Sequence, residues 1–363
     1  MAGLATGMQR IRPGADRLPT SLKPRAMYRL SAQAAPLSDR FLSELLPRIA
    51  EMGFDHLVMA SAPARSSLSQ LRAAAGSIAD ACRRRGLGLI VDLSLATRDP
   101  VAGASGDDEP PDPRRLRSRA SKTVPDDAAL SSLAASVAAQ WPAGVDGIIC
   151  PISSPVEACR WSEIGAQMRA DGSPMWLAAR SCREVDQGQL RDCGFDAVLS
   201  TAGNLEAWSR STPDPARQLL PAITCPEPLD GPRLAACIRH TPLLRRAYLR
   251  SLRLAAAVGD GLLLPMGFEF AAREIPAGTA EDELRWARQA APFDLTAEIA
   301  ATIAALGRRG DGPTALRGVS APGASVVALL RTATEPRPER AELILTNADL
   351  HRPSVVRPAQ LLR

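Results

Sequence analysis

The segment LGLIVDLSL, residues 87–95, is apolar at almost every position and is interrupted only by Asp92 and Ser94 near its end. A strand that is apolar on both alternating faces suits a parallel sheet whose two faces are covered by other elements. The segment GLLLPMGFEF, residues 261–270, has the same character over its first half. Both segments therefore predict a parallel sheet that is buried between helices.

Strand-like and helix-like segments alternate on both sides of residues 87–95. The predicted strands are residues 26–32, 56–61, 87–95, 144–152, 174–181, 195–201, 219–225 and 261–270. The predicted helices are residues 38–53, 68–86, 125–141, 155–170, 185–193 and 230–258. Eight strands alternating with helices over about 245 residues match the size and pattern of a (β/α)8 TIM barrel, a fold of the α/β class.

A doubly wound open sheet is the alternative arrangement of the same pattern. It is weakened because no early strand is followed by the glycine-rich fingerprint G-x-G-x-x-G. Strand-like segments without helices follow residue 308. We therefore expect a disordered N-terminal segment at residues 1–24, a barrel at 25–307 and a short C-terminal β-strand appendage at 308–363.

The composition is that of an ordinary globular protein, with 45% hydrophobic and 23% charged residues. The net charge of +5 is spread along the chain and aromatic residues make up 4%, so no nucleic-acid binding is expected. Seven cysteines without a C-x-x-C pair and only three histidines predict neither a metal site nor a cofactor. The chain has no long apolar run and its N-terminus lacks the apolar stretch of a secretory signal. A cytoplasmic protein that does not enter a membrane is therefore expected.

In such a barrel, chemistry takes place at the carboxyl ends of the strands. Few acids stand there: Asp92 lies near the end of the third strand, Glu227 and Asp230 follow the seventh, and Glu269 lies at the end of the eighth. The fourth and fifth strands end in the letters ICP and AAR, without a carboxylate. The strand ends thus do not predict an intact pair of groups for acid–base catalysis.

Six segments occur in the order in which the α-amylase superfamily (glycoside hydrolase family thirteen) carries them, and the chain resembles that family. They are GFDHLVMAS, RRRGLGLIVDLSL, GVDGIICPI, MWLAARS with CGFDAVLST, CPEPLDGPRLAA, and LLLPMGFEF. Within the family, the chain is most similar to the amylase-like region that some maltose-1-phosphate maltosyltransferases carry at their N-terminus. The resemblance covers about residues 25–275, and the tail resembles the start of the family's β domain.

The family uses carboxylates as retaining glycosidases do. The resemblance implies that its catalytic positions are degenerate in this chain. Ile149 stands for the arginine of the fourth-strand motif, Pro151 for the nucleophilic Asp, Ala179 for the general-acid Glu, and Leu229 for the His of a His-Asp pair. Proline and alanine can neither attack a sugar carbon nor protonate a leaving group, so no intact catalytic set is expected.

Asp92 and Asp230 are the vestigial acids that this alignment leaves. Asp230 stands directly before GPRLAA, and Asp at such a place also serves as a helix N-cap, so the two interpretations are compatible. Glu227 and Glu269 are candidate rescue carboxylates. For Glu269 the competing interpretation is a buried, hydrogen-bonded carboxylate that closes the barrel.

These replacements predict a pseudoenzyme that acts as a binding or scaffolding protein in α-glucan metabolism linked to glycogen and trehalose. Its expected partner is an active maltosyltransferase or an α-glucan, and a homodimer is a further expectation. The alternative is an α-1,4-glucan maltosyltransferase or glycosidase with relocated carboxylates. Glu227 and Asp230, three residues apart, would then form the nearest pair.

Overall fold

The computed structural model of the chain describes residues 23–30, 37–60, 68–93, 144–152, 154–170, 175–180, 186–201, 220–229, 232–273, 279–309, 314–320, 324–333 and 341–354. The predicted disordered segment lies outside these residues except for its last two positions. The predicted helix at 125–141 lies entirely outside them.

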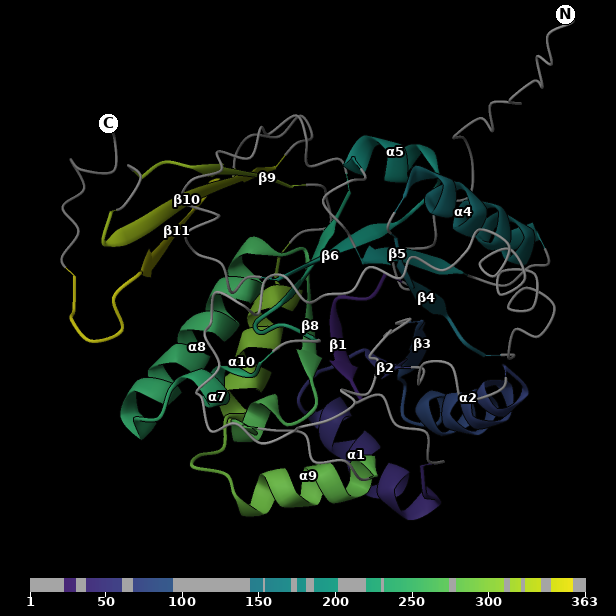
Figure 1. Cartoon of the computed structure of the whole chain (residues 1–363), viewed down its shortest axis with the longest axis horizontal. Coiled ribbons are helices and arrows are strands. Elements are labelled where there is room, and N and C mark those ends of the chain that lie inside the picture. The colour runs from purple at the N-terminus through teal and green to yellow at the C-terminus, as the bar shows by residue number, and fades with distance from the viewer. Residues whose placement is uncertain are drawn as a thin grey trace, which may run out of the picture.

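Eight parallel strands close into a barrel in which neighbours in the chain are also neighbours in space (Figure 1). β1 pairs with β8, with Met27 opposite Leu263, so the barrel sheet has no free edge. This closure confirms the predicted (β/α)8 barrel and excludes the open doubly wound sheet. The strands are β1 (Ala26–Arg29), β2 (His56–Ala60), β3 (Gly88–Asp92), β4 (Gly147–Pro151), β5 (Trp176–Arg180), β6 (Ala197–Thr201), β7 (Ala222–Cys225) and β8 (Gly261–Pro265).

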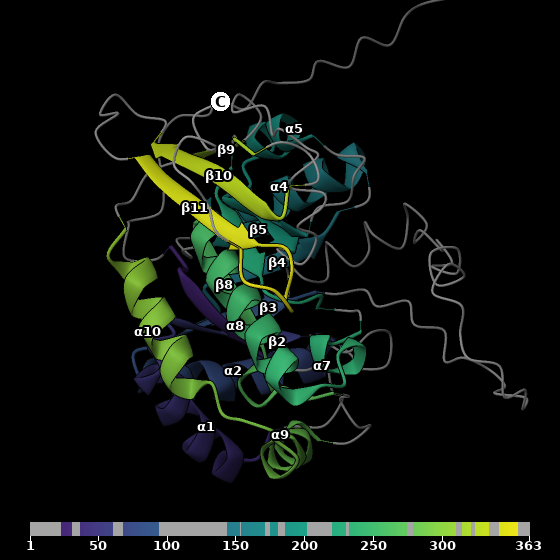
Figure 2. The same cartoon turned by 90° about the vertical axis from the view of Figure 1, so that its left-hand side faces the viewer.

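The described helices surround the barrel (Figures 1 and 2). They are α1 (Asp39–Glu51), α2 (Leu68–Arg83), α4 (Pro155–Ala170), α5 (Gln187–Asp192), α7 (Leu234–Cys237), α8 (Thr241–Val258), α9 (Ala280–Gln289) and α10 (Thr296–Gly307). The sequence reasoning did not single out α9 and α10 as separate helices.

Two predicted elements differ most clearly from those in the structure. The region predicted as one long helix at 230–258 is divided into α7 and α8, because Pro242 lies in the first turn of α8, where its missing N–H costs nothing. The strand predicted at 261–270 ends at Pro265, and a short 3-10 helix, η4 (Phe268–Phe270), follows. Gly267 makes this turn possible because its φ of 83° lies in the left-handed region that glycine tolerates.

Alternation along the strands separates the apolar side chains into two clusters. The interior cluster consists only of strand residues: Met27, Val58, Ile90, Ile149, Trp176, Ala178, Ala197, Leu199, Ile223, Cys225 and Leu263. The outer cluster combines the alternate strand positions with the inner faces of the helices. The interior is thus a packed core, as barrels of eight strands require.

Trp176 is the one aromatic side chain of the interior cluster, and it needs a small neighbour. Gly147 on the adjacent strand provides that space: a Cβ added there would lie 3.0 Å from Trp176 Cβ and 2.7 Å from the Trp176 carbonyl oxygen. Pairing a large residue with a glycine at facing positions lets the layer fill without strain.

A second, antiparallel sheet has the strand order β11-β10-β9. Its strands are β9 (Thr314–Gly318), β10 (Val326–Ala333) and β11 (Ala341–Asn347), all within the segment predicted as a β appendage. Figure 2 shows this sheet on the same side of the barrel as α8 and α10.

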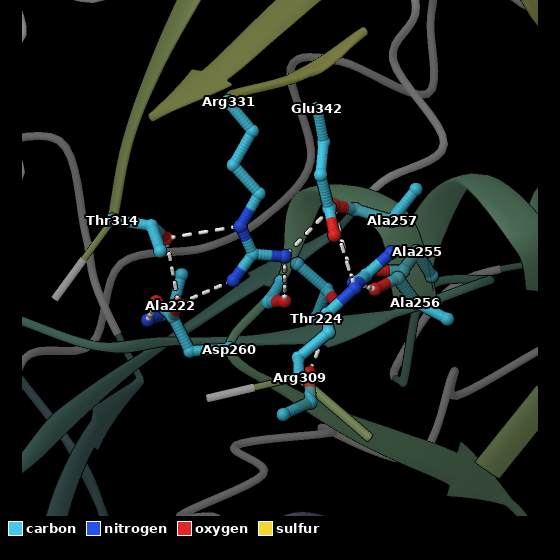
Figure 3. A network of polar contacts seen from close by, with 12 residues as sticks. Ala222, Thr224, Ala255, Ala256, Ala257, Asp260, Arg309, Thr314, Arg331 and Glu342 are labelled. Carbon is cyan, nitrogen blue, oxygen red and sulfur yellow. Dashed lines mark hydrogen bonds and ion pairs between the residues drawn. The ribbon is translucent and has the colours of Figure 1, made fainter. Parts of the chain in front are cut away.

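Arg331 of β10 joins this sheet to the barrel (Figure 3). Its Nη1 donates to the carbonyl oxygens of Ala257 and Gly259, both at 3.0 Å, and its Nη2 lies 2.8 Å from Asp260 Oδ1. Asp260 Oδ2 in turn accepts the backbone N–H of Ala222, at the start of β7. The guanidinium therefore ties the sheet to the end of α8 and to the beginnings of two barrel strands.

We predict that Arg331→Met lowers the free energy of unfolding by about 3 kcal/mol, because it removes the cation that binds Asp260 and the guanidinium donor of the Gly259 carbonyl. Urea denaturation measures the loss. The matched control is Arg317→Met, which removes an exposed arginine from β9 of the same sheet. A loss of similar size in both variants would contradict the anchoring role of Arg331.

Candidate functional site

The mouth of the barrel, at the carboxyl ends of the strands, is where catalysis would occur. Because strand side chains alternate, the residue two positions beyond an interior one also faces the interior. Counting on from Met27, Ile90, Ile149 and Ala178 of the interior cluster, the side chains directed to the mouth are Arg29, Asp92, Pro151 and Arg180. The mouth thus holds two arginines and one carboxylate on these four strands.

Asp92 is fully buried, and both arginines bind it. Arg29 Nε lies 2.7 Å and Arg180 Nη2 lies 2.5 Å from the same oxygen, Asp92 Oδ2. These charge-assisted hydrogen bonds connect the ends of β1, β3 and β5. We call these three residues the mouth cluster, and its formal charge is positive.

Three of the positions that the resemblance marked as degenerate lie in or beside the apolar interior of the barrel. Ile149 is fully buried in the interior cluster, and Leu229 packs against that cluster from the segment after β7. Pro151 ends β4 and is partly exposed. The apolar filling of the barrel therefore continues to its mouth.

Ala179 does not face the mouth. It belongs to the outer cluster, between β5 and the surrounding helices, and it is fully buried. Arg180 is the residue of β5 whose side chain reaches the mouth, since a shift of one residue along a strand moves a side chain to the opposite face. Sequence reasoning noted Arg180 at the strand end but missed its role and that of Arg29. Counting in steps of two from Met27 and Ala178 could have found both.

Glu227, a candidate rescue carboxylate, is fully buried and bonded on both oxygens. Its Oε1 accepts from Arg233 Nη1, and its Oε2 accepts the Leu234 backbone N–H at 3.1 Å and the Tyr248 hydroxyl at 3.5 Å. Burial raises the pKa of the Glu227 carboxyl, while Arg233 acts in the opposite direction. The contacts with Leu234 at the start of α7 and with Tyr248 of α8 place this carboxylate among the outer helices.

Glu269, the second rescue candidate, lies in η4 and is 1% exposed. Its Oε1 accepts the Tyr28 hydroxyl at 2.8 Å, and Tyr28 belongs to the outer cluster. Burial raises the pKa of the Glu269 carboxyl. These contacts agree with the interpretation of Glu269 as a buried, hydrogen-bonded carboxylate.

Asp230 lies outside the described residues, so its position relative to Glu227 stays a prediction. Asp92 is the only acidic residue in the eight barrel strands. Among the described residues, no cluster of three His, Cys, Asp or Glu side chains could hold a metal ion, and no described helix is long and apolar enough to cross a membrane.

Comparisons with known proteins agree with this geometry. No protein-family model matches the chain. Its barrel has the fold of α-amylases: it superposes on an α-amylase from Lactobacillus plantarum with a TM-score of 0.55 and 15% identity, over 86% of this chain and 89% of that one. A maltogenic amylase from S. marinus gives a TM-score of 0.57 with 11% identity, over 92% of this chain and 63% of that one.

In sequence, the chain is 31% identical over 374 residues to the alpha-1,4-glucan:maltose-1-phosphate maltosyltransferase of Burkholderia pseudomallei. This match covers 88% of the chain but 32% of the relative, so the chain spans about a third of the relative's length. The chain is thus an α-amylase-fold barrel that is homologous to part of a maltose-1-phosphate maltosyltransferase, which confirms the resemblance.

We predict that Asp92→Asn lowers the free energy of unfolding by about 3 kcal/mol, because it removes the anion that Arg29 and Arg180 share in a buried place. Urea denaturation gives the value. The control is Asp80→Asn, whose carboxylate pairs with Arg83 on the surface of α2 and should cost less than about 0.5 kcal/mol. Equal effects of the two changes would show that the mouth cluster contributes little.

We also predict that Glu269→Gln changes how stability depends on pH. A carboxyl whose folded pKa is raised binds its proton more tightly in the folded state. Its contribution to stability is therefore complete below the ordinary glutamate pKa and is lost as pH rises through the raised pKa. Glutamine does not titrate and still offers an oxygen to Tyr28, so the variant should gain stability relative to the native protein as pH rises.

Urea denaturation at about pH 5 and about pH 8 tests this sign. Glu44→Gln is the control, because Glu44 is exposed on α1 and pairs with Arg40. A free energy of unfolding of Glu269→Gln that, relative to the native protein, stays constant or falls from about pH 5 to about pH 8 would contradict the prediction.

Proposed function

We propose that the protein is a non-catalytic binding or scaffolding protein of α-glucan metabolism. The observation that carries this proposal is the mouth cluster: the one acidic residue of the eight barrel strands, Asp92, is held by Arg29 and Arg180. The homology to part of a maltosyltransferase supports the carbohydrate setting.

The chemistry of glycosyl transfer explains why this arrangement favours binding over catalysis. A retaining enzyme needs a free carboxylate as nucleophile and a second, protonated carboxyl about 5–5.5 Å away. Asp92 is buried and both arginines bind its Oδ2 atom, so this carboxylate is engaged in ion pairs and is not free to attack a sugar carbon. Ile149, Pro151 and Leu229 offer no acid or base near it.

The candidate rescue carboxylates also favour this proposal. Glu227 holds Arg233 and the start of α7, and Glu269 holds Tyr28. Each would have to give up a buried hydrogen-bond network before it could reach a sugar, at a cost of several kcal/mol. Relocated catalysis through Glu227 and Asp230 is therefore the less favoured alternative.

The name of the relative gives the proposed setting of the protein, namely α-1,4-glucan and maltose-1-phosphate. Within that setting the proposed partner is an active maltosyltransferase or an α-glucan, in the cytoplasm, with a homodimer as the proposed assembly. The proposal requires no cofactor and no metal.

The test is turnover of maltose-1-phosphate with a glycogen acceptor at high protein concentration, for the native protein and for Asp230→Ala. We expect no maltosyl transfer from either, with circular dichroism showing that both are folded. Transfer by the native protein that disappears in Asp230→Ala would overturn the proposal, because it would place a working carboxylate at the mouth.

A further inference from the structure

A cavity of about 650 Å³ lies outside the barrel, between α8, β11 and the residues that follow β11. We call it the α8–β11 groove. Its volume is in the range of protein ligand sites. Its apolar wall comes from both sides, with Leu249 and Leu254 on α8, and Ile344 and Leu350 on the opposite side.

Arginines line the α8 side of the groove. Arg246, Arg250 and Arg253 follow the spacing i, i+4, i+7, which places them in a row on one face of α8. The row is about 10 Å long, since a helix rises about 1.5 Å per residue. Arg352 adds a fourth guanidinium from the other side.

The single acidic residue of the groove does not balance this charge. Asp349 accepts the backbone N–H groups of His351 at 2.7 Å and Arg352 at 3.3 Å. These hydrogen bonds, that of His351 first, lower the pKa of the Asp349 carboxyl, so it is ionised at neutral pH. Four arginines and one carboxylate leave the groove strongly positive.

β11 has one edge that pairs with β10 and a second edge on the opposite side. In an antiparallel ladder, successive residues direct their N–H and C=O groups to opposite sides of the strand. The Ala348 N–H donates to the Ser325 carbonyl at 2.8 Å, which places the even-numbered residues of β11 in the ladder with β10. Leu343, Leu345 and Asn347 therefore direct their main-chain groups to the other edge.

The contacts of Arg250 show that α8 lies beside that edge of β11. Its Nη1 donates to the carbonyl oxygens of Asn347 at 3.0 Å and Ala348 at 2.9 Å. The outward edge of β11 thus faces α8 at this end. Among the described strands, β11 pairs only with β10, so the main-chain groups of Leu343 and Leu345 have no described strand to pair with.

The side chains on this part of β11 are also unusual for a surface. Leu343 is 49% exposed and Leu345 is 46% exposed, and both are among the large hydrophobic residues that the structure leaves in solvent. They lie two residues apart, on the same face of the strand. An edge strand with exposed leucines is a typical template for pairing with another chain.

We propose that the α8–β11 groove binds an extended, acidic segment of a partner protein. The segment pairs through its main chain with β11 at Leu343 and Leu345, and its carboxylates bind Arg246 and Arg253. Strand addition supplies main-chain hydrogen bonds, and the arginine row selects acidic side chains.

Charge decides between this occupant and a second copy of the chain. The chain has a net charge of +5, and pairing two β11 edges would bring two arginine rows together. Like charges across an interface are unfavourable, whereas an acidic segment is attracted and bound faster. This inference goes beyond the proposed function, because the groove shares no residue with the mouth cluster.

The test is fluorescence anisotropy with a short labelled peptide of alternating Glu and Val, whose carboxylates all lie on one face of an extended strand. Two matched peptides accompany it: one with Lys in place of Glu, and one with N-methyl groups on alternate amides. We expect binding of the first peptide only, since N-methylation removes the donors that strand pairing needs.

The protein variant is Arg246→Glu with Arg253→Glu, which should weaken binding of the acidic peptide by more than about tenfold. The matched control is Arg84→Glu with Arg85→Glu, an equal charge change at exposed positions after α2. Equal binding of the N-methylated and unmodified peptides would overturn strand pairing. Equal effects of the two double variants, or no binding of the acidic peptide, would overturn the site itself.

Discussion

Pairing of β1 with β8 closes the parallel sheet, and closure leaves an interior that side chains alone must fill. One face of every strand therefore supplies apolar side chains to the interior cluster, around Trp176 and its neighbour Gly147. The same alternation decides which side chains reach the mouth, because the last residue of each strand lies two positions beyond an interior residue and therefore faces the same way. The chemistry of the mouth thus follows from how the core is packed.

The mouth cluster is the charged end of that core. A buried carboxylate is costly unless cations and hydrogen bonds compensate for its lost water, and Arg29 and Arg180 provide this compensation for Asp92. The same compensation removes the freedom that a catalytic carboxylate needs. The cluster connects the ends of three strands, and under the proposed function its positive charge serves ligand binding rather than proton transfer.

The outer sheet carries the proposed docking surface, which shares no residue with the mouth cluster. Arg331 and Asp260 fix β10 against the barrel, so β11 is held at a defined place beside α8. A strand edge held in this way can serve as a template, and the arginines of α8 give it a preference for acidic chains. The protein would then combine an amylase-type barrel with a docking surface, as a scaffold requires.

The sequence by itself determined the barrel, because continuous apolar strands alternating with helices have few other ways to bury both faces of a sheet. Its resemblance to the amylase family also implied that carboxylates are missing at Pro151 and Ala179. Only the tertiary structure decided the partners of each charge. Asp92, Arg29 and Arg180 are far apart in the chain, and closure alone brings them together.

Glu227 and Glu269 show the same limit, since their environments come from Arg233, Tyr248 and Tyr28 rather than from adjacent residues. The resemblance pointed to Ala179, but the structure directs the next residue, Arg180, to the mouth, so a prediction of the mouth has to place each strand to within one residue. One residue reverses the face of a strand, and a sequence pattern locates strand ends less sharply than that. Long-range packing, which no local pattern contains, therefore decided which side chains meet at the mouth and which edge of β11 pairs with no described strand.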